Sequence, residues 1–377
     1  MFKDKSKKIL ITGGHPAPAI AVIDYILKNE SNIEIIFVGK KFNNSFEKSL
    51  SFEFQEISNR NILFEKIETG RSGHFMSLNG LLQFYLFIIA IYQAYKILKN
   101  HKPNAILTFG GYIGLPVIFL AKLFNIPIVI HEQTAIAGTA NRLMAFFAKK
   151  VCISFPESRK YFVNKNIVIT GNPIRDNIFD TNDCRIDLPS DNSFPVIYVT
   201  GGSLGSHAIN NLIEPILPEV LEFANVIHQT GNVLEFADFD RLQTLKNSLP
   251  DELKKRYYLF KHIATENIGC VYDKSDLIIS RSGANTFFEI LALKKPSIFI
   301  PLPYSAHGEQ LKHAKIMADA GTAHICLQSD SPKTLLKLIH DSLKTLKFQQ
   351  EAFKNLRVEY IKNASEKIIN EFFSVLN

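Results

Sequence analysis

The chain of 377 residues lacks tryptophan and has few sulfur-bearing side chains, with four methionines and four cysteines. The cysteines, Cys152, Cys184, Cys270 and Cys326, are far apart and form no C-x-x-C pair. This spacing argues against a zinc site and against a disulfide framework, and it favours a reducing cytoplasm as the compartment. Only three apolar residues follow the basic start at 3–8 before the glycines begin, so we expect no export segment.

The sequence also lacks an arginine-rich stripe, a zinc-finger pattern and an RNA-binding aromatic motif, which argues against nucleic acid as a partner. Lysine and arginine total 43 against 36 aspartate and glutamate, which gives a formal net charge of +7. A basic balance favours a polyanionic neighbour. Without nucleic-acid motifs, an anionic membrane surface is the better expectation.

The length exceeds what one hydrophobic core usually serves, and a hydrophobic content of 46% is enough for two cores. Short apolar runs of strand length alternate with helical patterns in both halves, as is typical of parallel sheets covered on both faces. The sequence therefore predicts an α/β fold with two Rossmann-like domains whose parallel sheets face a central cleft. The predicted strands are 9–11, 33–38, 105–109, 128–130, 151–153, 167–169, 196–199, 226–228, 258–260, 277–279, 297–300 and 323–326.

The two domains are separated by a segment rich in Asp, Asn, Ser and Pro, residues 176–195, which predicts a surface linker. The first domain is then 1–175 and the second 196–359. The stretch 344–376 has a charged helical pattern, and its end, about 360–377, can pack back on the first domain.

The segment 78–98 predicts a helix with apolar residues almost all the way round. Its longest uninterrupted apolar run, 84–92, is shorter than the about 20 residues that span a bilayer. Two interpretations stay open: a fully buried helix, or a helix that also contributes to a membrane-docking patch. The stretch 146–150, with two phenylalanines and two lysines, can extend such a patch, although an ordinary helix end followed by a strand explains it equally well.

Two glycine turns, Thr12–His15 and Gly201–Gly205, each follow a strand and precede a helical pattern, an arrangement that presents unpaired backbone N–H groups to an anion such as a diphosphate. The first turn lacks the G-x-G-x-x-G fingerprint, and the second predicted strand ends in Gly39-Lys40 without a carboxylate for a ribose. His15 is polar and close to any bound sugar, as a general base requires. A loop or helix-capping histidine is the alternative.

Other polar motifs of the first half follow strands, where open α/β sheets bind their ligands. They are Phe109–Tyr112 and His131–Gln133. The stretch Gly171–Arg175 places an arginine at the hinge, where it can reach a phosphate or a sugar. A plain interdomain turn is the alternative for this stretch.

In the second half, Ser280–Thr286 follows a strand and opens a helix whose first amides favour a diphosphate. Glu289 can accept hydrogen bonds from ribose hydroxyls, or it can merely complement the helix dipole. Gln310 is expected to begin another helix that points at the cleft. Asp238 and Asp240 form a D-x-D pair, but their charged helical surroundings favour a solvated face, so we expect no metal there.

Together these motifs resemble the bacterial MurG family of glycosyltransferase family 28, the undecaprenyl-diphospho-muramoylpentapeptide N-acetylglucosaminyltransferases of peptidoglycan synthesis. The likeness runs from about residue 12 to residue 320. Its most specific pieces are Thr12–Pro18, Phe109–Tyr112, His131–Gln133 with Ile136–Gly138, Gly171–Arg175, Gly201–Gly205 and Arg281–Ala284.

The resemblance implies a GT-B fold and an inverting transfer of N-acetylglucosamine from UDP-N-acetylglucosamine to the C4 hydroxyl of lipid-linked N-acetylmuramoyl-pentapeptide. It implies that the donor binds mainly to the second domain and that the acceptor binds to the first. His15 matches the family position usually considered the general base. The residues implied to bind the donor are Thr12, Gly13, Gly14, Thr134, Arg175, Ser203, Ile263, Ala284, Asn285, Thr286, Phe287, Phe288, Glu289 and Gln310, and those near the acceptor are Tyr112, His131, Glu132 and Asn210.

The resemblance further implies no cofactor and no metal, since backbone dipoles would stabilise the departing diphosphate. It implies a peripheral position on the cytoplasmic face of the cell membrane, with other cell-wall synthesis proteins as possible partners. Departures from the family pattern at Leu10, Ile11, Thr134 and Asn285 can retune donor recognition. Two other functions stay open: a UDP-N-acetylglucosamine 2-epimerase of the same fold, and a non-catalytic sugar-nucleotide-binding subunit.

Overall fold

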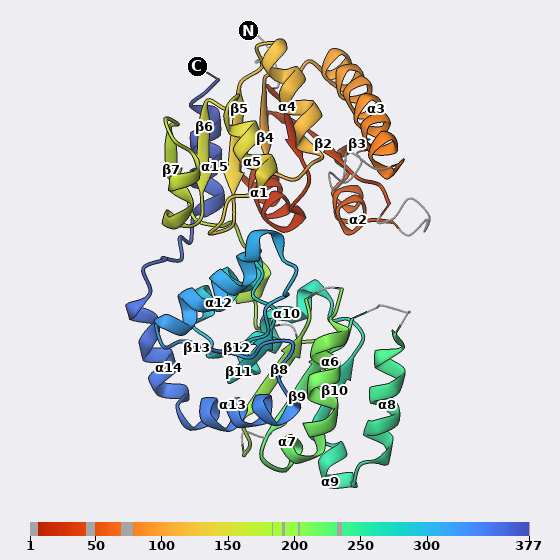
Figure 1. Cartoon of the computed structure of the whole chain (residues 1–377), viewed down its shortest axis with the longest axis vertical. Helices are drawn as coiled ribbons and strands as arrows, with labels where there is room; N and C mark the ends of the chain where they lie inside the picture. The colour runs from red at the N-terminus through yellow and green to blue at the C-terminus, as the bar shows by residue number, and fades with distance from the viewer. Residues whose placement is uncertain are drawn as a thin grey trace. The chain divides into compact units, whose positions relative to one another are not determined.

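A computed structural model describes residues 7–42, 50–68, 78–182, 184–190, 193–202, 204–231 and 236–376, and it leaves the side chains of 78–84 outside this description. The chain divides into two compact units, 1–175 with 361–377, and 176–360 (Figure 1). Each unit contains one parallel sheet with interleaved helices. The predicted α/β fold with two Rossmann-like domains is therefore confirmed.

The first unit has a seven-stranded parallel sheet in the order β3-β2-β1-β4-β5-β6-β7. The direction in which successive strands are added reverses between β1 and β4, and such a switch point is where open α/β sheets bind ligands. The strands are β1 (Lys7–Thr12), β2 (Ile33–Gly39), β3 (Leu63–Lys66), β4 (Ala105–Thr108), β5 (Ile128–Glu132), β6 (Lys150–Ile153) and β7 (Ile167–Ile169).

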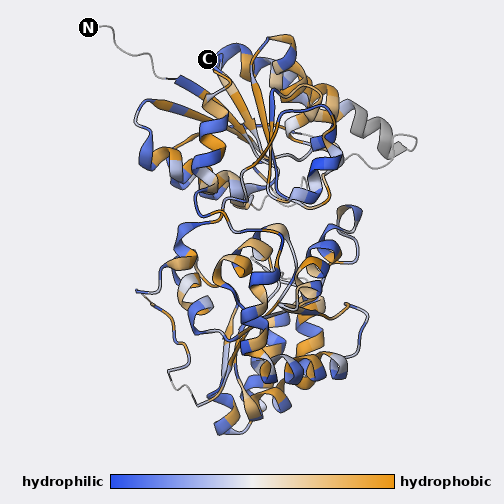
Figure 2. Ribbon diagram, turned by 90° about the vertical axis from the view of Figure 1, so that its left-hand side faces the viewer, coloured by the Kyte–Doolittle hydropathy of each residue, from blue (hydrophilic) through white to orange (hydrophobic). Residues whose placement is uncertain are grey.

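Apolar side chains cover both faces of this sheet, and its strands are mostly orange in Figure 2. Alternation along β1 shows how two cores form from one strand: Leu10 belongs to the core under α3, α4 and α5, whereas Ile9 and Ile11 belong to the core under α1, α2 and α15. The helices are α1 (Pro16–Asn29), α2 (Phe52–Asn59), α3 (Leu78–His101), α4 (Gly114–Leu123), α5 (Thr139–Ala145) and α15 (Ala364–Phe373), with 3₁₀ turns η1 (Pro156–Tyr161) and η2 (Asp176–Phe179), the latter in the second unit.

The C-terminal helix α15 is part of the first unit. Ile368 and Phe372 are buried in the same core as α1, and Lys150 donates a hydrogen bond to Ser374 Oγ over 2.7 Å. The sequence analysis predicted a helical pattern throughout 344–376, a range that includes α15. This prediction is wrong for 356–363, where no helix forms between η7 (Phe353–Asn355) and α15.

The second unit has a six-stranded parallel sheet in the order β10-β9-β8-β11-β12-β13, with its switch point between β8 and β11. Its strands are β8 (Val196–Thr200), β9 (Asn225–Gln229), β10 (Tyr257–Phe260), β11 (Leu277–Ser280), β12 (Ser297–Phe299) and β13 (Ala323–Ile325). Its helices are α6 (His207–Ile213), α7 (Leu217–Phe223), α8 (Asp238–Ser248), α9 (Asp251–Lys254), α10 (Ile268–Lys274), α11 (Ala284–Leu293), α12 (Glu309–Asp319), α13 (Pro332–Lys344) and α14 (Leu346–Ala352), with 3₁₀ turns η3 (Glu214–Ile216), η5 (Thr265–Asn267) and η6 (Ala306–Gly308).

Every strand predicted from the sequence overlaps a strand of the structure, and β3 was missed. Its sequence, Leu-Phe-Glu-Lys, is short and half polar, and it lies at the edge of the sheet with partly exposed residues. Phe64 packs on the core, but four residues with a polar half carry no apolar run, so periodicity could not mark the strand.

The helix predicted at 78–98 is α3. Its alternative as a fully buried helix is wrong, because Tyr85, Ile88 and Tyr92 are 61%, 52% and 57% exposed. Ala90 and Ala94, on the opposite side of the helix, are completely buried. One apolar face of α3 therefore lies at the surface.

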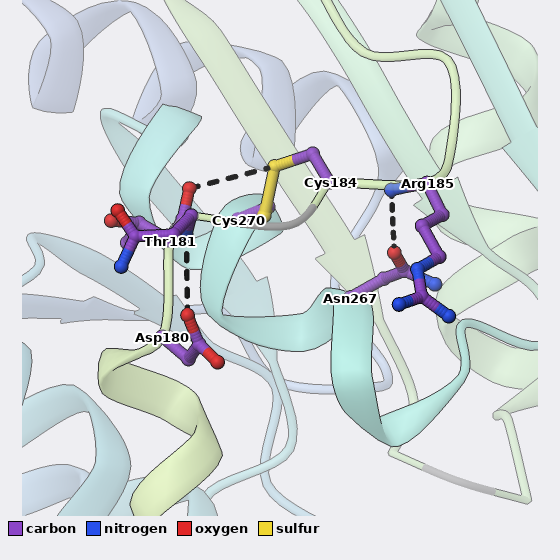
Figure 3. Close-up of a disulfide and its surroundings, with 7 residues drawn as sticks. Asp180, Thr181, Cys184, Arg185, Asn267 and Cys270 are labelled. Carbon is purple, nitrogen blue, oxygen red and sulfur yellow. Dashed lines mark hydrogen bonds between the residues drawn. A yellow bond between two sulfur atoms is a disulfide. The ribbon is translucent and has the colours of Figure 1, made fainter.

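Cys184 and Cys270 form a disulfide, with their Cα atoms 5.9 Å apart (Figure 3). The expectation against disulfides is wrong for this pair, because tertiary contacts join cysteines that are 86 residues apart. Gly269 lets α10 lie close to the segment around Asp180, since a Cβ on Gly269 would lie 2.1 Å from the carbonyl oxygen of Asp180. The spacing of the cysteines therefore gives no support for a reducing compartment.

Candidate active site

The first glycine turn lies at the switch point of the first unit, where β1 and β4 are neighbours. It packs against the loop that follows β4: a Cβ on Gly14 would lie 2.2 Å from the carbonyl oxygen of Gly110, and one on Gly111 would lie 2.9 Å from Gly14 Cα. Gly14 also has a φ of 127°, which L side chains rarely adopt. Only glycine allows these two loops to meet.

His15 lies directly after this turn, at the N-cap position of α1, with Pro16 as the first helical residue. Its side chain makes no capping hydrogen bond; instead its Nδ1 lies 2.8 Å from the carbonyl oxygen of Phe109. Because a carbonyl oxygen only accepts, Nδ1 carries the hydrogen and Nε2 has the lone pair. His15 thus occupies the N-cap position without a capping bond from its side chain, and the neutral imidazole is held in the tautomer that a base acting through Nε2 needs.

Glu53, on α2, packs against the first glycine turn at Gly13. The sequence analysis did not identify this residue. Its carboxylate accepts hydrogen bonds from the backbone N–H groups of Gly14 and Lys40. Burial raises the pKa of this carboxyl group, while the two N–H donors oppose the shift. The N–H of Gly13 is bonded to Val38 O. The N–H groups of Gly13 and Gly14, expected to be unpaired, are thus engaged within the protein.

His131, at the end of β5, is buried, and its Nε2 lies 3.0 Å from the carbonyl oxygen of Gly171. Burial lowers its pKa to about 4, so His131 is neutral at pH 7. Its ring lies 5.4 Å from the ring of Phe109, the residue whose carbonyl oxygen is bonded to His15.

Glu132, the next residue, is also buried and holds its own loop. Its carboxylate accepts from the N–H and the hydroxyl of Thr134, at 2.9 and 2.7 Å, from the N–H of Gly138 at 3.1 Å, and from the amide of Asn141 at 2.9 Å. Thr134 is buried with it. These contacts explain how Glu132 shapes the loop without requiring it to touch a ligand.

The other predicted residues of the first unit have contrasting positions. Thr12 is buried, and its hydroxyl donates a hydrogen bond to the hydroxyl of Thr108 over 2.6 Å. Its side chain therefore joins the ends of β1 and β4 at the switch point. Tyr112 is 43% exposed on the loop after β4. Arg175 is the last residue of the unit before η2.

The second glycine turn occupies the equivalent place after β8. Gly202 has a φ of 85°, and no described atom lies within 4 Å of a Cβ built there. Ser203, a predicted donor-binding residue, lies outside the described residues. Arg281 connects this turn with the loop after β11, donating to Ser206 Oγ over 2.7 Å and to Ile300 O over 2.9 Å.

The loop after β11 leads into α11, as predicted. Gly283 is its N-cap residue, and a glycine has no side chain to cap the helix. Ala284 and Asn285 begin the helix and Thr286 follows, so their N–H groups are those of a helix N-terminus. Glu289 lies further along, and its Oε2 accepts from the hydroxyl of Tyr272 over 2.8 Å.

Four further predicted residues pack against, or hydrogen-bond to, other parts of the second unit. Phe287 and Phe288 are completely buried and pack on each other, with ring centroids 5.2 Å apart. Ile263 is buried and its N–H donates to Gln229 Oε1. Gln310, on the first turn of α12, accepts from the N–H of Leu302. Both phenylalanines are buried as whole residues, so neither exposes a surface to a ligand in this structure.

Asn210, predicted near the acceptor, is completely buried on α6 of the second unit. Its amide donates to Asp238 Oδ2 over 2.7 Å, and its Oδ1 lies 3.0 Å from His228 Nε2. Asp238 also pairs with Arg241 at 2.9 Å. The expectation of a solvated D-x-D face is therefore wrong for Asp238, whereas the side chain of Asp240 is 75% exposed.

The described residues contain no group of three or more His, Cys, Asp or Glu side chains placed to hold a metal. In the same residues, no helix has the length and apolar character needed to cross a membrane.

Two Rossmann-like units, each with a glycine turn at its switch point, define the GT-B class of architecture. Models described as the glycosyltransferase family 28 N-terminal and C-terminal domains match residues 12–153 and 196–371. A relative from Clostridium kluyveri is 33% identical over 97% of this chain and 98% of its own length. One from Natranaerobius thermophilus is 34% identical over 86% of this chain and 87% of its own. The chain belongs to glycosyltransferase family 28.

Both relatives are named UDP-N-acetylglucosamine--N-acetylmuramyl-(pentapeptide) pyrophosphoryl-undecaprenol N-acetylglucosamine transferase. Among solved structures, MurG of Acinetobacter baumannii aligns with a TM-score of 0.72 and 25% identity, covering 98% of this chain and 99% of that one. A UDP-GlcNAc 2-epimerase of Neisseria meningitidis bound to UDP-GlcNAc aligns with a TM-score of 0.64 and 15% identity, over 98% of this chain and 100% of that one. The second likeness concerns the fold alone.

Proposed function

We propose that this protein transfers N-acetylglucosamine from UDP-N-acetylglucosamine to the C4 hydroxyl of undecaprenyl-diphospho-N-acetylmuramoyl-pentapeptide, with inversion at the anomeric carbon. The observation that carries the proposal is the near full-length match to relatives named for this transfer. The orientation of His15 supports it independently, because a glycosyl transfer to a hydroxyl needs a base.

In the proposed reaction, His15 Nε2 takes the proton of the C4 hydroxyl as its oxygen bonds to the anomeric carbon. The bond from that carbon to the diphosphate breaks, and UDP leaves with the electron pair. The hydrogen bond from Nδ1 to Phe109 O supports this role, since it fixes the ring and stabilises the imidazolium that forms.

The donor is proposed to bind the second unit. The N-terminus of α11, with Ala284, Asn285 and Thr286, offers backbone N–H groups and a positive helix end to a diphosphate. Stabilising the negative charge of departing UDP in this way needs no metal. Glu289 would accept from the ribose hydroxyls, and Ile263 would contact the base.

The acceptor is proposed to bind the first unit. Tyr112 is exposed on the loop that packs against the first glycine turn, next to Gly111, which lies against Gly14. His131 and Glu132 shape the same end of the sheet from inside.

A transfer assay tests this function: radiolabelled UDP-N-acetylglucosamine, purified acceptor lipid and a chelator. We expect labelled disaccharide-lipid and an equal amount of UDP. UDP-N-acetylmannosamine formed without lipid would instead identify a 2-epimerase. Donor binding without UDP release when the lipid is present would identify a non-catalytic subunit.

We also propose that the first unit binds an anionic bilayer, peripherally and on the cytoplasmic face, through a docking surface formed by α3, α4 and α5. Helix α3 packs on α4 and α4 on α5, and the rings of Tyr95 and Phe124 join the first two, 6.0 Å apart. The exposed apolar side chains of this surface are Tyr85, Phe87, Ile88, Tyr92, Tyr95, Phe119, Leu123, Phe124, Leu143 and Phe146.

The charge of the docking surface supports this proposal. The sequence from 69 to 156 contains a single acidic residue, Glu132, which is buried. Lys96 and Lys99 lie over the exposed rings of Tyr92 and Tyr95, at 4.6 and 5.5 Å from their centroids. Rings that insert at the headgroups and cations that attract anionic lipid are the two contributions that peripheral binding needs.

The lysines of the 146–150 stretch have other partners than expected. Lys150 bonds to Glu371 and Ser374, and Lys149 donates to Val375 O over 3.3 Å. They hold α15, so the docking surface depends on the lysines of α3 and on Lys122 of α4 instead.

Vesicle sedimentation tests the docking surface. With vesicles of phosphatidylglycerol and phosphatidylcholine, we expect Tyr92→Ser combined with Phe146→Ser to reduce binding about tenfold, since each change removes an apolar anchor. Leu27→Ser is the matched control, because Leu27 is 51% exposed on α1, which covers the other face of the sheet. Equal loss in the control, or binding that ignores lipid charge, would contradict the proposal.

A further inference from the structure

A buried tyrosine outside the predicted donor-binding set contacts Glu289. Tyr272, on α10, donates its hydroxyl hydrogen to Glu289 Oε2 over 2.8 Å. Its ring is 3% exposed and lies edge-on to the ring of Tyr198, with centroids 5.8 Å apart. Packing fixes the ring, and so the hydroxyl defines where one carboxylate oxygen of Glu289 lies.

Tyr198, on β8, continues these contacts to the neighbouring strand β9. The Tyr198 hydroxyl donates to Gln229 Oε1 over 3.3 Å, and the same oxygen accepts from the N–H of Ile263. Gln229 Nε2 donates to the carbonyl oxygen of Gly202 over 2.9 Å. Since that carbonyl only accepts, the orientation of the Gln229 amide is determined.

We infer that Tyr272, Tyr198 and Gln229 form a positioning set. This set fixes the relative positions of three proposed donor contacts: Glu289, Ile263 and the glycine turn at Gly202. Within this set, Tyr272 orients Glu289 for the ribose diol and so determines the preference for a ribonucleotide donor. The inference rests on the proposed function and deepens it. Its physical basis is preorganisation, because a carboxylate already oriented loses no freedom when the ribose binds.

Helix α10 is itself fixed in place, which this role requires. Cys270, two residues before Tyr272, is bonded to Cys184. At the start of the helix, Asn267 Oδ1 accepts from the N–H of Arg185 over 2.9 Å, as Figure 3 shows. The tyrosine therefore projects from a helix that is covalently attached to the chain preceding β8.

Titration calorimetry of the full-length protein with UDP and with 2′-deoxy-UDP tests the inference. Tyr272→Phe removes one oxygen and keeps the ring. We expect the Kd for UDP to rise about three- to tenfold and the Kd for 2′-deoxy-UDP to rise clearly less, because only UDP offers both hydroxyls of the diol to the oriented carboxylate of Glu289. In the transfer assay, KM for the donor should rise while kcat stays within about twofold.

Two control variants separate this role from a general packing effect. Tyr198→Phe should weaken both nucleotides equally, about two- to threefold, since it acts on the Ile263 side of the set. Tyr258→Phe, a partly exposed ring on β10, should change neither affinity. If Tyr272→Phe fails to fold, Glu289→Gln tests the same end of the set and should abolish the discrimination between the two nucleotides.

The outcomes separate the inference from the proposed function. Unchanged discrimination in Tyr272→Phe, or equal weakening of both nucleotides, would overturn the inference. Full additivity of Tyr272→Phe and Glu289→Gln would also overturn it, since residues acting as a unit are not additive. If the wild-type protein binds no UDP, the proposed function fails instead.

Discussion

The two units share one topology, but their glycine turns are built differently. In the first unit the turn is closed: Gly14 touches Gly110, and Glu53 accepts the N–H of Gly14 from below. The second turn also packs against a neighbouring loop, since a Cβ on Gly205 would lie 2.0 Å from the carbonyl oxygen of Thr230, but apart from its chain neighbours no described atom lies within 4 Å of a Cβ built at Gly202. The comparison teaches that both turns use glycine to pack against a neighbouring loop, but the first adds a carboxylate against its N–H group and holds His15, whereas the second keeps open space at Gly202.

The largest expected effect comes from the side chain that the closed turn holds. His15→Ala should lower kcat about 10²- to 10⁴-fold, the range for loss of a general base. The Kd for UDP, measured by calorimetry, should not change, because the donor is proposed to bind the other unit. Near-normal turnover would remove the base assignment, and lost UDP binding would erase the contrast between the units.

The two turns themselves can be compared with matched glycine substitutions. Gly202→Ala should cost about 1–2 kcal/mol, the strain of a left-handed backbone. Gly14→Ala should cost about 2–5 kcal/mol, because its Cβ would also overlap the backbone of Gly110. Urea denaturation measures both, and equal losses would mean that the first turn is not closed by its neighbour.

The disulfide should distinguish the units next. Reduction, or Cys184→Ser, should destabilise the second unit by about 2–4 kcal/mol, since the bond closes a long loop. Hydrogen exchange of the β8 and β11 amides would report the loss, while β1 and β4 keep their protection. Cys326→Ser is unsuitable as a control because Cys326 is buried; Leu27→Ser, on the surface of the first unit, serves instead.

The smallest expected effect is the response to acid. At pH 5 the free energy of unfolding of the second unit should fall by about 2 kcal/mol more than that of the first unit. Burial lowers the pKa of His228 to about 3 and of His313 to about 4 in the second unit, and of His131 to about 4 in the first. Each stays neutral when folded but takes a proton when unfolded, so stability falls as pH drops below about 6.5, by about 2 kcal/mol per histidine at pH 5.

Glu53 widens this difference. Because its folded pKa is raised, its contribution to stability is present at low pH and is lost as pH rises through that value. The first unit is thus partly protected where the second is weakened. Exchange protection compared at pH 7 and pH 5 measures the difference, and a larger loss in the first unit would contradict these pKa directions.

Sequence reasoning found what depends on local pattern. Apolar runs such as Val196–Val199 marked the strands, and the glycine turns marked the ends of β1 and β8. It missed what depends on contacts between distant residues: Glu53 beneath the first turn, and Tyr272 against Glu289. It also read Asp238 as solvated, because the helical pattern around it does not show that α6 covers it.

By itself, the sequence determined two parallel sheets, their glycine turns and the position of His15, since alternation, chain reversal and helix initiation are set by residues close together in the chain. Only the tertiary structure decided which atom of His15 is available, which amides the first turn has already used, and that Cys184 meets Cys270. Hydrogen bonds and disulfides require atoms within a few ångströms, and folding alone brings residues so far apart in sequence to that distance.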